Sequence, residues 1–162
     1  MVDLEHFRAI FKPLPGNHYL EVSTTTDEIT KLFSDMMQGV GGEFNLALYG
    51  KNKQNLHAIN ARVQYIDDFK APFRALPRDH DAVLLKDIFH LHQNQEMMLK
   101  LSYLTLANTA NIIIMEKKGI LDIDKVVKQL EDFEFRAPNT IEAVERYDLL
   151  IAKKMHMWGN GL

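Results

Sequence analysis

Apolar residues occur along this chain in short runs that are separated by segments with helical spacing. Between apolar runs at 82–85 and 111–115 lies an amphipathic segment in which Met97, Leu101 and Leu104 recur at i, i+4 and i+7. This is the spacing of one face of a helix. Two buried apolar runs joined by a helix are typical of parallel strands in a right-handed βαβ unit.

The same alternation extends over the rest of the chain. The strongest helical stripe covers residues 29–40, and Thr25 and Glu28 before it have the spacing of a capping box. Further helices are predicted at 4–11 with Asp3 as N-cap, at 51–60, and after Asp122 as N-cap. The expected strands are 18–23, 44–49, 62–66, 82–85, 111–115, 134–137 and 147–152. Strands that alternate with helices predict an α/β fold, in which a mostly parallel seven-stranded sheet forms the middle layer of a three-layer α/β/α sandwich.

Length and composition narrow the class of protein. The chain has 162 residues, enough for one hydrophobic core, and we expect a single domain over residues 1–162. The formal charge of −3 is too small to indicate nucleic acid or an anionic membrane as a partner. The chain has no cysteine, which excludes disulfides, thiol nucleophiles and thiolate metal sites. It also shows no signal-peptide pattern and no apolar run near ~18 residues, so we expect no membrane span and a cytoplasmic location.

Ligands of open α/β sheets gather at the carboxyl ends of the strands, which makes the residues just past the run at 82–85 candidates for chemistry. They include Lys86, Asp87, His90 and His92. Asp87 or His90 is suited to proton transfer, and together with His92 they form a second candidate, a weak zinc or iron site. In a helix His90 and His92 would diverge by about 200°, given ~3.6 residues per turn, so we predict no metal site. Loop capping and packing are the third interpretation of these side chains.

The segment from residue 76 to 119 also carries a family pattern. Leu76-Pro77 forms a turn before the Asp-Ala-Val start of the apolar run, a loop with Asp87 and His90 follows, and then come a helix and a strand. This order resembles the fourth-strand to fifth-strand segment of class I S-adenosylmethionine-dependent methyltransferases. The family has paired glycines where this chain has Thr109-Ala110. The resemblance covers about residues 18–154 and implies a Rossmann-like sheet of seven strands that ends in an antiparallel hairpin.

The resemblance also implies where a cofactor would lie. In the family the first strand ends in an acidic residue followed by a Gly-x-Gly loop. Here Glu21 stands in the place of the acid, but residues 23–26 are Ser and three Thr instead of glycines. Each of these side chains adds a Cβ that obstructs the close approach of a ligand to the backbone. The hydroxyls of Ser23 and Thr24 are left with two interpretations, binding an anion at the helix N-terminus or capping that helix.

Two further cofactor contacts of the family have counterparts here. An acidic residue at the end of the second strand typically holds the ribose hydroxyls, but this strand ends in Tyr49 with no carboxylate. Tyr49 can stack or donate one hydrogen bond, or it can simply pack beneath the next helix. An acid at the end of the third strand commonly approaches the adenine amino group, and Asp67 or Asp68 matches it. A solvated turn is the other interpretation of this acidic pair.

Three functions remain open on these grounds. The first is an active methyltransferase that binds S-adenosylmethionine in an atypical loop, with Asp87 or His90 near the acceptor. The second is a degenerate, non-catalytic relative that serves as an interaction or regulatory module, and the loss of two of three cofactor contacts favours it. The third is an unrelated small-molecule or metal site at the carboxyl ends of the same strands. The apolar tail at 155–158 additionally suggests a homodimer, because such groups are unfavourable when exposed.

Overall fold

The computed structural model describes residues 4–51 and 55–155. Its elements in chain order are α1 (Leu4–Phe11), β1 (His18–Ser23), α2 (Glu28–Gly39), β2 (Glu43–Tyr49), β3 (Arg62–Ile66), β4 (His80–Lys86), α3 (Gln95–Thr105), β5 (Leu106–Lys117), α4 (Ile123–Asp132), β6 (Phe135–Ile141) and β7 (Tyr147–Lys154). The strands form one seven-stranded sheet in the order β3-β2-β1-β4-β5-β7-β6. Strands β1 to β5 are parallel, and β7 runs antiparallel to both β5 and β6. The predicted fold class is therefore confirmed.

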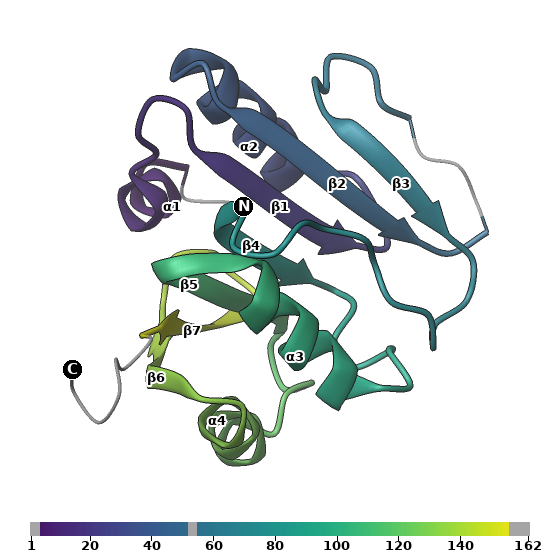
Figure 1. Cartoon of the computed structure of the whole chain (residues 1–162), viewed down its shortest axis with the longest axis vertical. Coiled ribbons are helices and arrows are strands. Elements are labelled where there is room, and N and C mark those ends of the chain that lie inside the picture. The colour runs from purple at the N-terminus through teal and green to yellow at the C-terminus, as the bar shows by residue number, and fades with distance from the viewer. Residues whose placement is uncertain (1–3, 52–54, 156–162) are drawn as a thin grey trace.

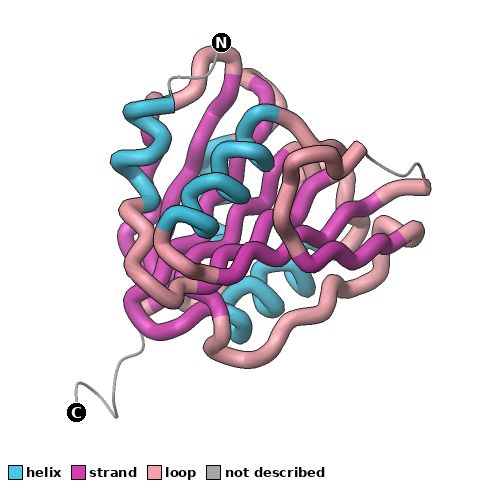
Figure 2. Tube along the Cα trace, turned by 90° about the horizontal axis from the view of Figure 1, so that it is seen from above, coloured by secondary structure: helices cyan, strands magenta, loops and turns pink. Residues whose placement is uncertain are grey.

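The sheet lies between two layers of helices, with α1 and α2 on one side and α3 and α4 on the other (Figures 1 and 2). Alternate side chains of β4 pack against the two layers of helices. Val83 and Leu85 belong to the core beneath α3 and α4, whereas Ala82 and Leu84 belong to the core beneath α1 and α2. Successive side chains of a strand point to opposite faces, so a strand covered on both faces must be apolar throughout. This explains why the run at 82–85 shows no polar alternation.

The helix caps agree with the predictions only in part. Asp122 is the N-cap of α4, as predicted, and accepts a hydrogen bond from the backbone N–H of Lys125 at 3.3 Å. The predicted capping box at Thr25 and Glu28 is wrong, because Asp27 is the N-cap of α2. Its carboxylate is better placed there, since it accepts from two backbone N–H groups of the first turn. The predicted cap Asp3 lies outside the described residues.

The predicted helix over 51–60 is absent from the described part of that range, which consists of turns and irregular backbone. A single turn is closed by the N–H of Ile59, which donates to the Leu56 carbonyl at 3.1 Å. Ala58 has a φ of +62°, outside the helical region. Leu56 and Ile59 are too few apolar residues to offset the cost of nucleating a short helix. The described residues 50–51 and 55–61, between β2 and β3, therefore form turns and loop.

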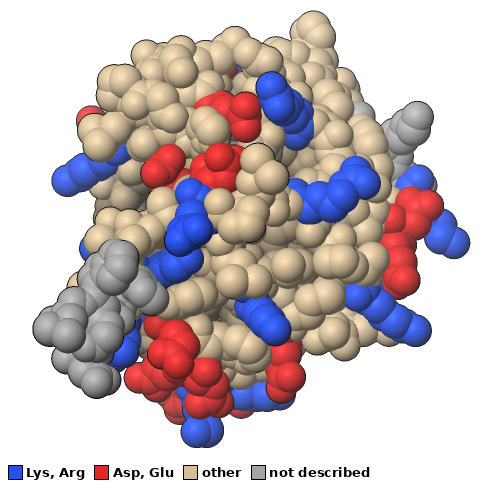
Figure 3. Space-filling view, viewed as in Figure 1, with Lys and Arg blue, Asp and Glu red and all other residues tan. Residues whose placement is uncertain are grey.

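The surface carries both signs of charge. On the face shown in Figure 3, Lys and Arg side chains are interspersed with Asp and Glu. None of the described helices has both the length and the apolar character needed to cross a bilayer. Of the apolar tail on which the predicted homodimer rests, only Met155 is described, and its side chain is exposed. The rest of that tail lies outside the described residues, so the homodimer stays a prediction.

Candidate functional site

The strand order reverses at β1, whose neighbours β2 and β4 continue the sheet in opposite directions. Ligands of open α/β sheets bind at such a switch point, outside the carboxyl ends of the strands. The register pairs Ser23, the last residue of β1, with Lys86, the last residue of β4. The N-terminus of α2 follows β1 after a short loop. The region between the carboxyl ends of β1 and β4 and the N-terminus of α2 is therefore where the fold would place a ligand.

The side chain of Lys86 occupies this region. It is fully buried, and its Nζ lies 2.7 Å from Asp27 Oδ1 and 3.2 Å from Glu21 Oε2. The ammonium also donates to Thr30 Oγ1 at 3.2 Å and to the carbonyl oxygen of Thr25 at 3.3 Å. An ammonium has three donors, so these four acceptors leave none of its hydrogen-bonding capacity for a further ligand. The lysine is held as a structural cation.

The ionisation of this cluster follows from burial and charge together. Burial alone would lower the pKa of Lys86, but the carboxylates of Glu21 and Asp27 outweigh it, and the pKa lies above its ordinary value. Burial raises the pKa of Glu21, against the opposing effects of the Lys86 ammonium and the Thr30 hydroxyl. Glu21 Oε1 is buried without a hydrogen-bond partner among the described residues. Lys86 is thus charged at neutral pH, and the buried carboxyl of Glu21 is the less well compensated member of the pair.

The hydroxyls predicted near a cofactor are used within the loop. Ser23 Oγ is buried and lies 2.7 Å from the Thr25 carbonyl oxygen and 3.1 Å from Glu21 Oε2. Thr24 Oγ1 lies 3.5 Å from the carbonyl oxygen of Asp87. The structure therefore brings Glu21, Ser23, Thr24 and Asp87 together at the carboxyl ends of β1 and β4. Their hydrogen bonds join β1 to β4 and shape the loop.

The other predicted cofactor residues lie toward β2 and β3. Tyr49 is buried, and its hydroxyl donates to the carbonyl of Ala71 at 2.6 Å. Burial is the main cause that raises the pKa of Tyr49, with a smaller effect from Asp68. Asp67 and Asp68 are exposed, and the carboxylate of Asp68 accepts from the backbone N–H of Lys70 at 2.8 Å. In this arrangement Tyr49 anchors the loop after β3, and the two aspartates border it.

A second cluster lies at the carboxyl ends of β4, β5 and at the start of β7. His90 Nδ1 is 2.7 Å from Oε2 of Glu116, and the backbone N–H of His90 donates to the same oxygen at 2.9 Å. The hydroxyl of Tyr147 donates to Asp87 Oδ2 at 3.2 Å. Burial raises the pKa of Glu116, although the hydrogen bonds from His90 oppose it. A buried carboxylate that orients a half-exposed imidazole is an arrangement suited to proton transfer.

His92 does not join this cluster. Its ring is buried beside Tyr49, its Nε2 lies 3.1 Å from the Ala71 carbonyl oxygen, and its Nδ1 accepts from the backbone N–H of Asn94 at 2.9 Å. Both ring nitrogens of His92 are therefore used in packing the loop. Beside His90 the surface is hollowed by about 150 Å³. The residues that line this hollow include Phe89, Gln95, Leu121, Asp122 and Gln129.

Sequence reasoning missed four members of these clusters, Asp27, Thr30, Glu116 and Tyr147. Glu116 directly follows the apolar run at 111–115, and a charged residue at the end of a buried strand was a usable signal. For Asp27 and Thr30 the signal was their separation of three residues before an apolar stripe, which is capping-box spacing. Tyr147 offered none, because its partner Asp87 lies 60 residues away in the chain.

Comparison with known proteins identifies the fold. No protein-family model matches the chain, and no curated protein matches it. Among solved structures it is similar to a SAM-dependent methyltransferase from Aquifex aeolicus, with 18% identity, a TM-score of 0.70 and coverage of 94% of this chain and 89% of that one. It is also similar to a TehB-like SAM-dependent methyltransferase from Corynebacterium glutamicum, with 12% identity, a TM-score of 0.72 and coverage of 94% and 86%.

A third similar structure is the CurJ carbon methyltransferase, with 14% identity, a TM-score of 0.72 and coverage of 96% of this chain and 54% of that one. The chain spans about half the length of this CurJ protein. At such identities the likeness concerns the fold. The chain has a class I methyltransferase-like fold, as its sequence resemblance predicted.

Proposed function

We propose that this chain is a degenerate methyltransferase-like protein, which has replaced the cofactor site by an internal ion pair and acts as an interaction or regulatory module. The observation that carries the proposal is the buried Lys86 ammonium at the switch point, between Glu21 and Asp27. Glu21, the counterpart of the family's strand-end acid, is thus paired with a side chain of the protein itself, as is the N-cap Asp27.

The helix N-terminus supports the same conclusion. A ligand at this position normally uses free backbone N–H groups of the first helical turn. In α2 the N–H groups of Ile29 and Thr30 donate to Asp27 Oδ1 at 3.0 and 3.2 Å, so the cap already satisfies them. Residues 23–26 carry side chains where the family has glycines, and each added Cβ obstructs the close approach of a ligand to the backbone. A ligand with a positively charged sulfonium would also lack a free counter-charge here, because the carboxylates of Glu21 and Asp27 are already paired with Lys86.

Calorimetric titration of the full chain with S-adenosylmethionine and S-adenosylhomocysteine tests the proposal. We expect no binding of either ligand at millimolar concentration. S-adenosylhomocysteine is the matched control, because it lacks the sulfonium charge and separates electrostatic exclusion from loss of space. Micromolar binding of either ligand that is abolished in Glu21→Gln would overturn the proposal.

A second candidate function is an active S-adenosylmethionine-dependent methyltransferase with an atypical cofactor loop. The observation in its favour is the His90–Glu116 pair, which resembles a base with its orienting carboxylate and borders the hollow of about 150 Å³. In this proposal Glu21, Ser23, Thr24, Tyr49 and one of Asp67 and Asp68 surround the cofactor, and Asp87 or His90 lies near the acceptor.

Transfer of a tritium-labelled methyl group to a panel of small-molecule acceptors tests this second candidate. Labelled product from the full chain, lost in His90→Ala and kept in the exposed-site control His57→Ala, would support it. Binding of the cofactor without labelled product from any acceptor would count against it.

A further inference from the structure

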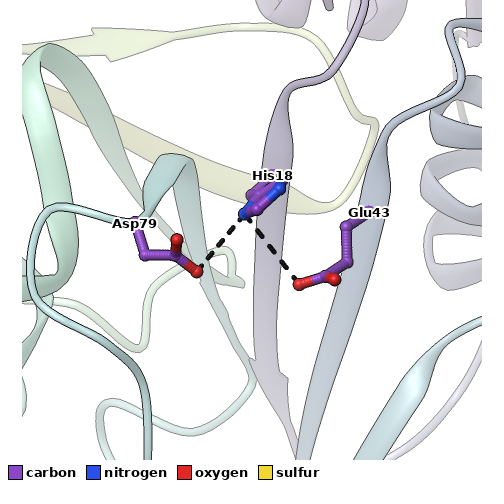
Figure 4. A group of neighbouring side chains, drawn as sticks. All are labelled: His18, Glu43 and Asp79. Carbon is purple, nitrogen blue, oxygen red and sulfur yellow. Dashed lines mark hydrogen bonds and ion pairs between the residues drawn. The ribbon is translucent and has the colours of Figure 1, made fainter.

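A group of metal-ligand side chains lies at the opposite end of the sheet, where the parallel strands begin. His18 is the first residue of β1, Glu43 is the first residue of β2, and Asp79 directly precedes β4. The register pairs His18 with Glu43. Figure 4 shows the imidazole of His18 between the carboxylates of Asp79 and Glu43. Three separate parts of the chain thus contribute one side chain each to the same small volume.

The separations of the donor atoms suit a metal ion. His18 Nδ1 lies 3.3 Å from Asp79 Oδ2 and 3.9 Å from Glu43 Oε2, and one ligand atom from each of the three residues lies within 4.8 Å of the others. Bonds of about 2.0–2.2 Å that meet at tetrahedral angles separate the donors by roughly 3.3–3.6 Å. Small side-chain rotations would therefore bring these three atoms to the distances of a tetrahedral centre.

The surroundings hold the three side chains in place. The backbone N–H of His18 donates to Asp81 Oδ2 at 2.8 Å, which fixes the start of β1 against β4. The side-chain amide of Asn45 donates to Glu43 Oε2 at 2.9 Å and lies 2.9 Å from Nε2 of His80. Such a hydrogen bond to a ligating carboxylate is a usual companion of metal sites, because it orients the ligand.

An unpartnered buried group and a hollow mark the same place. His80 is only 2% exposed, and its Nδ1 has no hydrogen-bond partner among the described residues. Buried polar atoms are usually hydrogen-bonded, so this nitrogen needs a partner that the described residues do not supply. A hollow of about 210 Å³ is lined by Glu43, Asn45, Asp79 and His80, and also by Arg62. It gives an ion access to the carboxylates and leaves room for a further ligand.

We propose that His18, Glu43 and Asp79 bind a divalent transition-metal ion of the zinc class, with an open coordination position toward the hollow. One imidazole and two carboxylates form a nitrogen–oxygen donor set that zinc accepts, and three protein ligands with one open position are typical of zinc sites that bind a further ligand. Without a metal ion, the three side chains form a cluster in which His18 lies between the two carboxylates. The site is independent of the switch point, since it lies at the other end of the strands.

Calorimetric titration of the chelator-treated full chain with zinc chloride tests the proposal. We expect saturation at one Zn²⁺ per chain, and a loss of affinity of at least about tenfold in His18→Ala, Glu43→Gln and Asp79→Asn. The matched control is His57→Ala, which removes an exposed histidine of the loop before β3 and should leave the affinity unchanged. The chain loaded with Co²⁺ should show visible absorption bands, and these bands should disappear when Zn²⁺ displaces Co²⁺.

The far-ultraviolet circular dichroism of each metal-free variant establishes whether it is folded. If His18→Ala does not fold, His18→Gln and Asp79→Asn carry the test, because both keep the size and polarity of the side chain. Absence of saturable binding, or an affinity that Asp79→Asn and the folded His18 variant leave unchanged, would overturn the proposal. Equal losses in His57→Ala and the ligand variants would also overturn it. The result does not depend on whether S-adenosylmethionine binds.

Discussion

Replacement of Lys86 by methionine isolates the energetic role of the ion pair at the switch point. Methionine preserves most of the side-chain volume, so the main loss is the ammonium. Glu21 is fully buried, whereas the side chain of Asp27 is 34% exposed, and the cost of the change therefore falls mainly on Glu21. Removal of one partner of a buried ion pair typically costs about 3–5 kcal/mol, because an uncompensated charge stays behind.

At this chain length about 1 kcal/mol shifts the melting temperature by roughly 2–4 °C, so the expected decrease is roughly 6–20 °C. Urea unfolding at pH 7, followed by far-ultraviolet circular dichroism, measures the free energy directly. The control is Lys31→Met, which breaks the exposed i,i+4 pair between Lys31 and Asp35 and should cost less than about 0.5 kcal/mol.

The same variant has a predictable pH dependence. Burial already raises the pKa of Glu21, and loss of the Lys86 ammonium removes an effect that lowers it. A carboxyl whose folded pKa lies above its unfolded value stabilises the fold fully below the unfolded pKa, and this stabilisation is lost as the pH rises through the folded pKa. The deficit of Lys86→Met should therefore be smaller at pH 4.5 than at pH 7. A second change, Glu21→Gln, should recover part of the loss at pH 7.

Two results would refute this reasoning. A loss below about 1 kcal/mol in Lys86→Met at pH 7 would mean that the lysine is not the counter-charge of a buried carboxylate. A deficit that grows as the pH falls toward 4.5 would mean that Glu21 is not the group left uncompensated.

Three further changes test other parts of the structure. Tyr49→Phe removes one of two groups that contact the Ala71 carbonyl oxygen, since His92 Nε2 also lies 3.1 Å from it, and should lower the free energy of unfolding by about 0.5–1.5 kcal/mol, measured in urea; an unchanged value would argue against an anchoring role. Burial raises the pKa of the Glu116 carboxyl above 4.5, so the parent chain loses the stabilisation from this group as the pH rises. The stability of Glu116→Gln relative to the parent chain should therefore rise between pH 4 and pH 7 in thermal melts, and a constant difference would contradict the raised pKa. Asn94→Ala removes the N-cap of α3, whose side chain accepts a backbone hydrogen bond at 3.1 Å, and should cost about 1 kcal/mol; a neutral result would show that the first turn is held by packing alone.

The candidate sites show where sequence reasoning reached its limit. Lys86 and Glu21 were both visible at strand ends, but their contact depends on the register between β1 and β4. The pairing of His90 with Glu116 likewise depends on the neighbouring position of β4 and β5, although the two residues lie 26 positions apart. Nothing in the local pattern indicates which polar side chains share a hydrogen bond across such distances. Those contacts are properties of the assembled sheet.

The sequence by itself determined the alternating elements and the α/β class, because helices and buried strands impose different periods on apolar residues over a few turns or pleats. It did not determine the segment at 51–60, where a weak apolar pattern competes with the cost of helix nucleation. Only the tertiary structure decided that His18 meets Asp79, which lies 61 positions away. The physical reason is that strand order and register set the distances between strand ends, and these are decided by the packing of the whole core.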